Sequence, residues 1–389
     1  MRIALITAEY PPYSNGGIGT FSYELSRGLN MLGYDTFIVT KGHSIIYKPQ
    51  STNEHFLTSP AIPPKDIWFY TTRSFDITRI IREIKPDVIH DAGEAISYLP
   101  WISKQAPTII TIHGTPLLSR IRLLMEGEDR VKLILFDLMH SIPAKLMQLI
   151  TKPDIKRIVF VSKSALWDSL MGMDNNARNE LLKKARVVYN GVDINWLRSI
   201  AKSVGYVEDY SAAFIGRLME YKGVKWLVRA FRHVVDELPG ARLHIVGDGP
   251  IYRDVKELVD KLDLGRNVIM HGSLPRTEAM RVLAKSMILT HPSLAEGFGI
   301  VIAEAYAMGK PVIAHKSTYS YELVAKTGAG LMINTLNEKE YANALTQLLT
   351  DKNLYRRLSQ RALEVSEKFS VEAMAKGYIE IYREAINEA

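Results

Sequence analysis

The sequence predicts an α/β protein made of two doubly wound parallel sheets, each in its own domain. Short runs rich in Val and Ile alternate with longer segments of helical period, which is typical of βαβ units with helices on both faces of a sheet. The alternation pauses near residue 190 and then starts again. The 389 residues are enough for two or three domains, each with its own core.

The first series of elements occupies the N-terminal half of the chain. Its apolar, β-branched runs predict strands, and its segments with apolar residues three and four positions apart predict helices. Strands are expected at 2–8, 36–40, 88–90, 108–113, 157–161 and 187–189, and helices at 19–32 and 78–85.

The second series follows a break in the pattern. The residues from Asn190 to Asp193 are typical of a turn, and a polar stretch continues to Asp209. We therefore expect a hinge at 193–209, a first domain at 1–195 and a second domain at 196–369. In the second domain, strands are expected at 211–215, 242–246, 268–271, 287–290 and 311–314, and helices at 224–237, 252–262, 276–284 and 299–308.

The last predicted helix, at 371–385, has an apolar face. Ser370 is a suitable N-cap, and the helical period places Met374, Tyr378 and Tyr382 on one side. We expect 370–389 to cross back and pack on the first domain. Periodicity alone leaves packing on the second domain as a close alternative.

Composition excludes several classes of protein. The chain has no cysteine, so a disulfide scaffold, a thiolate zinc site, an iron–sulfur cluster and a cysteine nucleophile are excluded. The net charge of +7 is spread over both halves, whereas a nucleic-acid-binding protein would more often show a basic stripe. Diffuse positive charge suits anionic small molecules or an anionic membrane surface. Sparse Gln beside abundant Glu, Lys and Arg is typical of a thermophilic source.

The apolar runs are short. None approaches the ~18 residues that span a bilayer, and residues 1–10 have neither the apolar core nor the cleavage site of a signal peptide. We therefore expect a cytoplasmic protein.

A glycine-rich loop follows the first strand. Gly16, Gly17 and Gly19 allow a ligand to approach backbone N–H groups, and the helix that follows presents the positive end of its dipole to an anion. The spacing is not the GxGxxG of dinucleotide-binding proteins, and no acidic residue closes the second strand, so a nicotinamide dehydrogenase is disfavoured. A loop that needs glycine only for its turn is the alternative.

Two further segments follow predicted strands of the second domain. Arg217 and Lys222 lie where open α/β sheets bind ligands, and two cations there suit a diphosphate, although a solvated basic loop is the alternative. In the segment 290–304, the amides of Phe298, Gly299 and Ile300 can cradle an anion or a hydroxyl.

The same segment carries two carboxylates. Glu304 stands in an apolar helix, where a buried carboxylate needs partners such as the vicinal hydroxyls of a sugar or ribose. The alternatives are pairing with an internal Arg or Lys for Glu304 and a helix-charge role for Glu296.

Together these segments resemble the GT-B nucleotide-sugar glycosyltransferases, in particular the large retaining family 4, also called glycosyl transferases group 1. The resemblance covers nearly the whole chain. It rests on the order and spacing of GGIGT at 16–20, TIHGTP at 111–116, NGVD at 190–193, GRLMEYKG at 216–223, VGDGP at 246–250 and EGFGIVIAE at 296–304, and on the terminal helix.

The resemblance implies a fold and a set of roles. Two Rossmann-like domains face each other across a cleft, and a nucleoside-diphosphate sugar lies mainly on the second. Arg217 and Lys222 neutralise the diphosphate, Glu296 holds hydroxyls of the transferred sugar, and Glu304 holds those of the ribose. Amides at Phe298, Gly299 and Ile300 bind the sugar or a phosphate, Gly16 and Gly17 approach the diphosphate from the first domain, and His113 lies beside the transferred sugar. Without the resemblance, His113 would be taken for a satisfied histidine at a strand end.

The implied reaction needs no metal and no cofactor. The chain contains no D-x-D triplet, so the metal-binding motif of the other major glycosyltransferase fold is absent. Cations and amides aimed at the departing diphosphate can replace the metal. For retaining members the resemblance implies transfer on one face, with the leaving phosphate helping to deprotonate the acceptor, so no enzyme nucleophile is named.

One stretch departs from the pattern. After residue 314, many relatives place a Gly-Gly turn before a glutamate, whereas this chain has Ser317-Thr-Tyr-Ser-Tyr-Glu322. The departure affects the local loop geometry and leaves the donor motifs intact.

The segment 117–156 bears on the acceptor. It mixes Leu, Ile and Met with basic residues and predicts two helices in the domain where relatives dock acceptors. An amphipathic helix that faces the core is the favoured interpretation, and peripheral contact with the inner membrane face is the minority hypothesis. Binding to anionic liposomes at low salt tests the membrane hypothesis.

The residues leave other functions open. A GT-B-fold nucleotide-sugar epimerase would isomerise the sugar without an acceptor, and a non-catalytic nucleotide-sugar-binding protein would bind the donor without turnover. A polysaccharide phosphorylase would need a lysine that bears pyridoxal phosphate, and no segment indicates one. The nucleotide base, the sugar, the acceptor and the oligomeric state leave no signal in the sequence.

Overall fold

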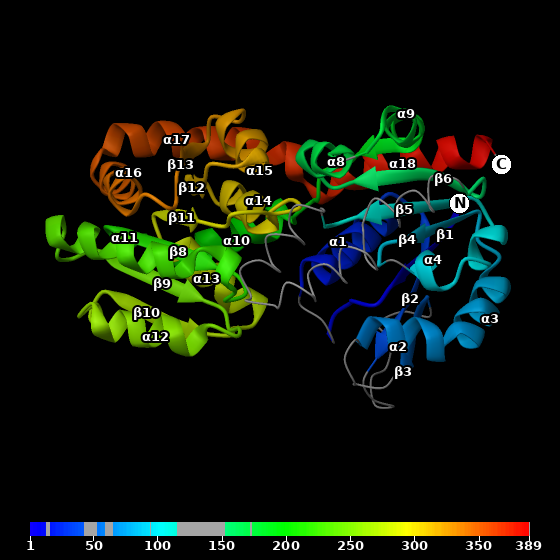
Figure 1. The fold of residues 1–389 in the computed structure, drawn as a ribbon, viewed down its shortest axis with the longest axis horizontal. Helices are drawn as coiled ribbons and strands as arrows, with labels where there is room; N and C mark the ends of the chain where they lie inside the picture. Colours follow the sequence, from blue (N-terminus) through cyan, green and yellow to red (C-terminus); the bar gives the residue numbers. More distant parts are fainter. Residues whose placement is uncertain are drawn as a thin grey trace. The chain divides into compact units, whose positions relative to one another are not determined.

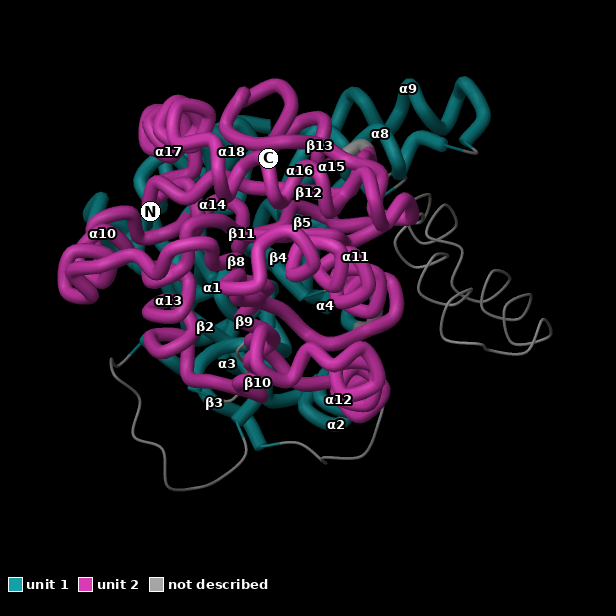
Figure 2. Tube along the Cα trace, turned by 90° about the vertical axis from the view of Figure 1, so that its left-hand side faces the viewer, with its two compact units in different colours: residues 1–116, 135–191, 371–389 teal, residues 117–134, 192–370 magenta. Residues whose placement is uncertain are grey.

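The protein is described by a computed structural model over residues 1–12, 16–42, 53–58, 65–93, 95–114, 152–171 and 173–388. These residues form two compact units (Figure 2). Unit 1 holds the described residues up to 114, those from 152 to 191, and 371–388, whereas unit 2 holds 192–370. Each unit contains one parallel sheet, as the alternation of strands and helices predicts.

Unit 1 contains a seven-stranded parallel sheet. Its strands are β1 (Arg2–Thr7), β2 (Asp35–Gly42), β3 (Glu54–Thr58), β4 (Val88–Asp91), β5 (Thr108–Ile112), β6 (Ile155–Phe160) and β7 (Ala185–Val187). Its helices are α1 (Gly17–Met31), α2 (Lys65–Thr72), α3 (Ser74–Ile84), α4 (Ala95–Tyr98), η1 (Ile102–Lys104), α8 (Lys163–Leu170), α9 (Asn175–Lys184) and α18 (Val371–Asn387). The strand order is β3-β2-β1-β4-β5-β6-β7, and every neighbouring pair is parallel.

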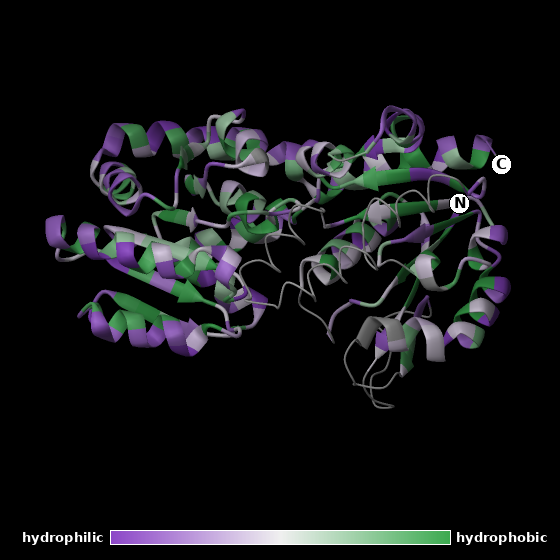
Figure 3. Ribbon diagram, in the orientation of Figure 1, coloured by the Kyte–Doolittle hydropathy of each residue, from purple (hydrophilic) through white to green (hydrophobic). Residues whose placement is uncertain are grey.

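The central strands of this sheet are apolar on both faces. In β1, the five residues after Arg2 are all buried, because helices cover both sides of the sheet. Figure 3 shows the strands as the most hydrophobic parts of the unit, whereas the outer faces of its helices are hydrophilic. This distribution is why the strands read as continuous apolar runs rather than alternating ones.

Helix α18 belongs to unit 1, as predicted. In Figure 1 it is the red helix that ends at the C-terminus, and it packs against α1, where Gly28 leaves no space for a side chain beside Val371 and Ala375. Met374, Tyr378 and Tyr382 are buried with the core of the first sheet. Packing on the second domain, the alternative that periodicity left open, is not what the structure contains.

Two tyrosines of α18 also form hydrogen bonds with the sheet. The hydroxyl of Tyr382 lies 2.8 Å from Nδ1 of His90, and that of Tyr378 lies 2.9 Å from Oγ1 of Thr111. Nε2 of His90 lies 2.7 Å from the same Thr111 oxygen. The terminal helix is therefore bound to β4 and β5 by polar contacts as well as by apolar packing.

Unit 2 contains a six-stranded parallel sheet. Its strands are β8 (Ser211–Ile215), β9 (Arg242–Val246), β10 (Val268–Gly272), β11 (Ile288–His291), β12 (Val312–His315) and β13 (Gly330–Ile333). Its helices are α10 (Ile194–Val204), η2 (Glu220–Lys222), α11 (Val224–Glu237), α12 (Tyr252–Lys261), α13 (Arg276–Lys285), α14 (Ile300–Ala307), α15 (Thr318–Ser320), η3 (Tyr321–Ala325), α16 (Glu338–Thr350), α17 (Lys352–Ser366) and η4 (Glu367–Phe369). The strand order is β10-β9-β8-β11-β12-β13, again with parallel neighbours.

The stretch that was expected to be a hinge contains a helix. Residues Ile194–Val204 form α10. At its start the Trp196 amide donates a hydrogen bond to the side chain of the N-cap residue Asp193 (3.0 Å), and at its end Gly205 is the C-cap residue, with φ +76°. The polar stretch 193–209, expected as a hinge, is therefore helical over most of its length, and its apolar residues Ile194, Leu197 and Ile200 are buried in unit 2.

The chain leaves and re-enters unit 1 at neighbouring points. The amide of Val192 donates a hydrogen bond to the carbonyl of Phe369 (2.8 Å), and Val192 pairs with Ser370 in a parallel bridge. Within the described residues, the two points at which the chain passes between the units therefore lie side by side.

Candidate active site

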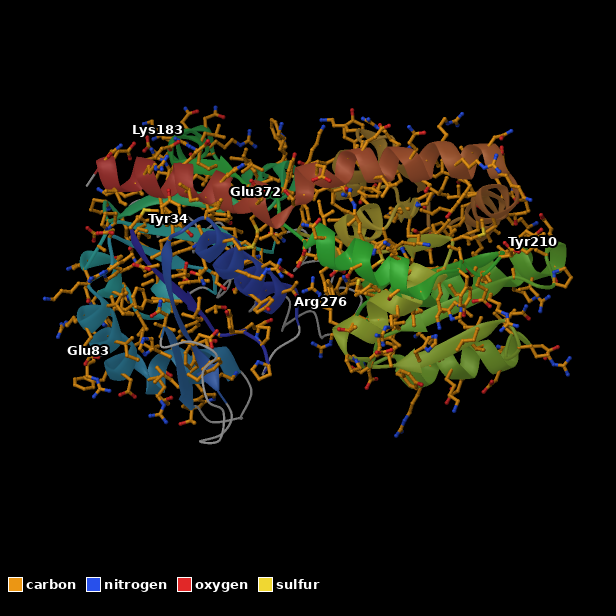
Figure 4. The ribbon with its side chains drawn as sticks, turned by 180° about the vertical axis from the view of Figure 1, so that it is seen from behind. Tyr34, Glu83, Lys183, Tyr210, Arg276 and Glu372 are labelled. Carbon is orange, nitrogen blue, oxygen red and sulfur yellow. The ribbon has the colours of Figure 1, made fainter. Side chains whose placement is uncertain are left out.

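The candidate site of unit 2 lies where β8, β9 and β11 end. β8 has β9 on one side and β11 on the other, so the chain runs outward from β8 in both directions. Ligands of open α/β sheets bind at such a reversal, outside the carboxyl ends of the strands. Figure 4 shows the two ends of unit 2: Tyr210, which precedes β8, lies at one end, and Arg276, which follows β10, lies at the other.

Glycines allow the loops at these strand ends to touch through their backbones. A Cβ on Gly247 would lie 1.9 Å from the Gly216 carbonyl oxygen, and one on Gly249 would lie 2.3 Å from that of Leu218. Gly223, with φ +72°, approaches the carbonyl oxygen of Pro292 in the same way, at 2.4 Å from its ideal Cβ. The GRLMEYKG, VGDGP and EGFG segments are thus one packed assembly, which the sequence did not reveal.

Lys222 and Glu296 meet in this assembly. The Lys222 ammonium forms an ion pair with Oε1 of Glu296, and Nε2 of His291 lies 3.3 Å from the same oxygen. The two charged side chains are only 15% and 12% exposed. Burial alone would raise the pKa of the Glu296 carboxyl, but Lys222, with a contribution from His291, holds that pKa well below its usual range. The carboxyl is therefore ionised at neutral pH.

Glu304 has a different partner. Oε1 of this carboxylate accepts hydrogen bonds from Arg276, at 3.0 Å from Nη2 and 3.3 Å from Nε. The side chain of Glu304 is 8% exposed, and the guanidinium of Arg276 lies 4.9 Å from the ring centre of Trp196. Pairing with an internal arginine is the alternative that the sequence left open for Glu304.

The two carboxylates share one feature. In each, Oε1 is paired and Oε2 has no partner in the described part of the chain, although it is not enclosed. A free, solvent-accessible oxygen on a largely buried carboxylate can accept a hydrogen bond from a hydroxyl group. Glu296 and Glu304 can each do so without breaking the contact at Oε1.

Arg217 is exposed at the end of β8. Within the described residues it forms no hydrogen bond or ion pair. Its charge is therefore available to an anion, whereas the charge of Lys222 is shared with Glu296.

The start of α14 brings backbone amides to the same edge. Gly299 is the N-cap residue with φ +81°, and Ile300 is the first residue of the helix, so its N–H has no partner within the helix. Phe298 is buried, and its ring packs edge-on against Phe369 (5.8 Å between centres). The predicted helix began one residue earlier, at 299.

Gly16, Gly17 and His113 belong to unit 1. Gly16 is the N-cap residue of α1, and a Cβ on Gly17 would meet nothing within 4 Å in the described residues, so the position of Gly17 is not crowded. The ring of His113 packs edge-on against Phe21 (4.6 Å). Burial lowers the pKa of His113 to about 3, against a smaller effect of a backbone hydrogen bond with Ala92, and its Nε2 has no partner in the described residues. The imidazole is therefore neutral at pH 7.

The sequence analysis missed several residues that support the site. His291 is 3% exposed and stands at the end of β11, and Tyr319, also buried, donates a hydrogen bond to the Ser293 carbonyl (2.7 Å) from the stretch that departs from the family pattern. Arg276 and Trp196 come from a helix start and from the supposed hinge. Of these residues, only Arg276 could have been recognised from the sequence, because it is a cation directly after Pro275 and near the strand ends.

A cavity of about 260 Å³ lies elsewhere in unit 2. It is lined by Tyr206, Glu208, His244, His271, Val282 and Lys285. None of the predicted site residues lines it, so its position does not bear on them. Among the described residues, no group of three or more His, Asp or Glu side chains is arranged to hold a metal ion.

Part of the segment 117–156, on which the membrane hypothesis rests, lies outside the described residues, which resume at 152. Within the described chain, no helix is both long and apolar enough to cross a membrane.

Two family models match the chain, one on each half. The model described as Glycosyltransferase Family 4 matches residues 15–196, and the one described as Glycosyl transferases group 1 matches 198–365. An uncharacterised glycosyltransferase of Methanocaldococcus jannaschii is 25% identical over 99% of both chains. The N-acetyl-alpha-D-glucosaminyl L-malate synthase of Bacillus anthracis is 25% identical over 100% of this chain and 98% of its own.

Solved structures share the fold. Sucrose-phosphate synthase of Thermosynechococcus elongatus superimposes with a TM-score of 0.79 at 19% identity, over the whole of both chains. Anabaena HepE, solved in complex with UDP and glucose, gives a TM-score of 0.74 at 17% identity, over 98% of this chain and 99% of its own.

Proposed function

Because the chain belongs to the group 1 and family 4 glycosyltransferases and has their two-domain GT-B fold, we propose that it transfers a sugar from a nucleoside diphosphate to a hydroxyl acceptor. The transfer retains the configuration of the sugar and uses no metal ion. The acceptor is a glycan, a small sugar or a lipid-linked sugar.

The observation that carries this proposal is the pair of largely buried carboxylates at the edge of the second sheet. Glu296 and Glu304 each keep one oxygen free while a cation holds the other. A donor with hydroxyls at both ends, on its sugar and on its ribose, matches two such acceptors. Arg217 and Lys222 lie at the same strand ends and supply positive charge for the diphosphate between them.

Electrostatics favours departure of the diphosphate. As the bond between the sugar C1 and the phosphate oxygen breaks, positive charge grows on the ring and negative charge on the diphosphate. Arg217 is already free to meet that charge, and Lys222 can turn from Glu296 toward it. Preorganised cations in a site shielded from water stabilise such a transition state strongly.

The acceptor proton goes to the leaving group. The acceptor oxygen bonds to C1 on the face from which the diphosphate departs, and its proton passes to the phosphate oxygen that leaves. Glu296 remains ionised throughout because its pKa is held low, so it serves as a hydrogen-bond acceptor for sugar hydroxyls rather than as an acid.

The residues of unit 1 complete the assignment. The neutral imidazole of His113, with its unpartnered Nε2, accepts a hydrogen bond from a hydroxyl of the transferred sugar. Gly17, where a Cβ would meet nothing within 4 Å, and its neighbour Gly16 offer backbone to the diphosphate. The amides at Phe298, Gly299 and Ile300 bind the sugar or a phosphate oxygen.

Binding of UDP-, GDP- and ADP-sugars to the purified protein tests the proposal. One donor should bind, and its affinity should fall at least tenfold in Glu304→Ala, because a hydrogen bond to a charged acceptor is lost. Glu278→Ala, an exposed position in α13, is the matched control and should bind normally. A folded protein that binds none of the three classes of donor would contradict the proposal.

Turnover separates transfer from the remaining alternatives. Nucleotide release that depends on an added hydroxyl acceptor, survives EDTA and gives a product of unchanged anomeric configuration by NMR is the expected result. Isomerisation of the donor sugar without an acceptor would indicate an epimerase, and donor binding without any turnover would indicate a non-catalytic protein.

A further inference from the structure

Arg276 stands at the junction of two elements of unit 2. It is the first residue of α13 and follows Pro275, which links the helix to the end of β10. Its side chain is 29% exposed, and Figure 4 shows it at the end of the unit where the strands finish. From there it reaches both Glu304 on α14 and Trp196 on α10.

The contacts of Arg276 with Glu304 are one-sided. Nη2 and Nε approach the same oxygen, Oε1, at 3.0 and 3.3 Å. A guanidinium that formed the usual fork would occupy a lone pair on each of the two carboxylate oxygens. Here Oε2 stays unpartnered in the described residues.

Trp196 also contacts the guanidinium of Arg276. The guanidinium carbon lies 4.9 Å from the centre of the indole ring, within the range of a cation–π interaction. The indole restrains the guanidinium from one side while Glu304 binds it from another. The backbone amide of Trp196 in turn donates the N-cap hydrogen bond to Oδ1 of Asp193 (3.0 Å).

We propose that Arg276, held by Trp196, is a positioning residue that orients Glu304 so that its Oε2 selects ribose over deoxyribose in the donor nucleotide. The inference rests on the proposed function, since it assigns a partner to the carboxylate that is there taken to bind the ribose. Arg276 acts through Glu304 and touches no reacting atom.

The physical argument concerns burial. A carboxylate that is 8% exposed is costly unless a cation pairs with it, yet a cation bound to both oxygens would compete with a ribose hydroxyl for Oε2. Pairing at Oε1 alone neutralises the buried carboxylate and leaves Oε2 for a ribose hydroxyl. Without Arg276, the carboxylate would lose its paired cation and turn toward water, and the oriented acceptor for a ribose hydroxyl would be lost.

Affinities for paired nucleotides test the inference. The diphosphate that binds most tightly among UDP, GDP and ADP is compared with its 2′-deoxy and 3′-deoxy forms by calorimetry. In the unaltered protein, we expect at least one deoxy form to bind tenfold or more weakly, as loss of a hydrogen bond to a charged group implies. In Arg276→Gln, that ratio should fall below threefold.

Two variants serve as controls for this experiment. Arg281→Gln changes an exposed arginine of the same helix, which is paired with Glu278, and should keep the full ratio. Arg276→Lys retains the charge but not the planar donor pair, so it should recover overall affinity and only part of the ratio.

Trp196→Leu tests the same geometry without removing a charge. It should reduce the ratio while leaving most of the affinity, and it remains informative if Arg276→Gln fails to fold. A full ratio in both folded Arg276→Gln and Trp196→Leu would overturn the inference.

The outcomes also separate this inference from the proposed function. If Glu304→Gln abolishes the ribose preference but Arg276→Gln does not, the donor site stands and the positioning role is wrong. If the unaltered protein binds no diphosphate, the proposed function itself fails.

Discussion

The ion pair of Lys222 with Glu296 makes its two members sensitive to substitution. Lys222→Met should lower the free energy of unfolding by about 3 kcal/mol, because it leaves a largely buried carboxylate without its cation. Urea unfolding measures this loss. Lys225→Met is the matched control: Lys225 pairs with Glu220 and Asp254 in a more exposed setting, so its loss should cost less than about 1 kcal/mol. Equal losses in both variants would contradict the buried pair.

Gly247 offers a second prediction at the scale of single residues. Its φ is +140°, and an added Cβ would overlap the Gly216 carbonyl oxygen at 1.9 Å. Gly247→Ala should therefore destabilise unit 2 by at least about 2 kcal/mol and weaken donor binding, because the loops of the site must separate. Gly265→Ala, where a Cβ would meet nothing within 4 Å, is expected to change little. Thermal unfolding of the two variants provides the comparison.

Individual site residues were predictable only in part. Lys222, Glu296 and Glu304 stand in motifs, and the structure brings the first two together and leaves the third with Arg276. The sequence could not indicate that Arg276 is the partner, because the two residues are 28 positions apart on different helices. His291 was missed for a similar reason: a histidine at the end of a buried strand carries no signal of the carboxylate it faces.

At the scale of elements, the contacts of α18 with β4 and β5 imply a dependence on pH. Burial, with a smaller effect of His113, lowers the pKa of His90 to about 3, whereas the unfolded chain protonates its histidines near 6.5. The folded state therefore binds fewer protons between these values. Its stability should be highest above pH 6.5 and should fall as the pH drops toward 3, by about 1.4 kcal/mol per pH unit for this one group.

His90→Gln isolates that contribution. Glutamine can still meet the Tyr382 and Thr111 hydroxyls but does not titrate. Between about pH 4 and 6, the slope of the free energy of unfolding against pH should be smaller in the variant by about 1.4 kcal/mol per pH unit, the value for one proton. Urea unfolding at several pH values measures the slope. An unchanged slope would show that His90 is not the titrating group.

Most strands and the helices α1, α11 and α18 were predicted, whereas strands β3 and β13 and the long helices α16 and α17 were not. Buried strands of a parallel sheet read as short apolar runs, and these were identified in both halves of the chain. Helix α10 was missed because its polar positions and the turn before it suggested a linker. Yet Asp193 as N-cap, Ile194, Leu197 and Ile200 on one face, and Gly205 after the end are signals of a helix. The prediction for this stretch relied on its polar composition rather than on the helical period of its apolar residues.

At the scale of the whole molecule, the two units differ in how they are assembled from the chain. Among the described residues, unit 2 is one continuous stretch, 192–370, whereas unit 1 needs α18 from beyond it. The fragment 192–370 should therefore fold alone and bind the donor nucleotide through its own residues. Circular dichroism and calorimetry on the fragment check both expectations.

The matching fragment of unit 1 should behave differently. Residues 1–191 lack the helix that buries Tyr378 and Tyr382 against the sheet, so this fragment should remain molten or aggregate. Adding the peptide 371–389 should restore a cooperative transition. A fragment 1–191 that unfolds cooperatively without the peptide would contradict the structural role of α18.

The return of α18 to unit 1 also has a consequence for how the protein is made. On the ribosome, the first sheet is synthesised early, but the helix that covers it appears only after all of unit 2 has been translated. At about 5–20 residues per second, the delay is roughly 10–40 s. During that interval the apolar surface awaiting α18, which includes Phe21 and Leu25, is uncovered and open to chaperones. Unit 2 can mature in the meantime, so the nascent chain completes its later domain first.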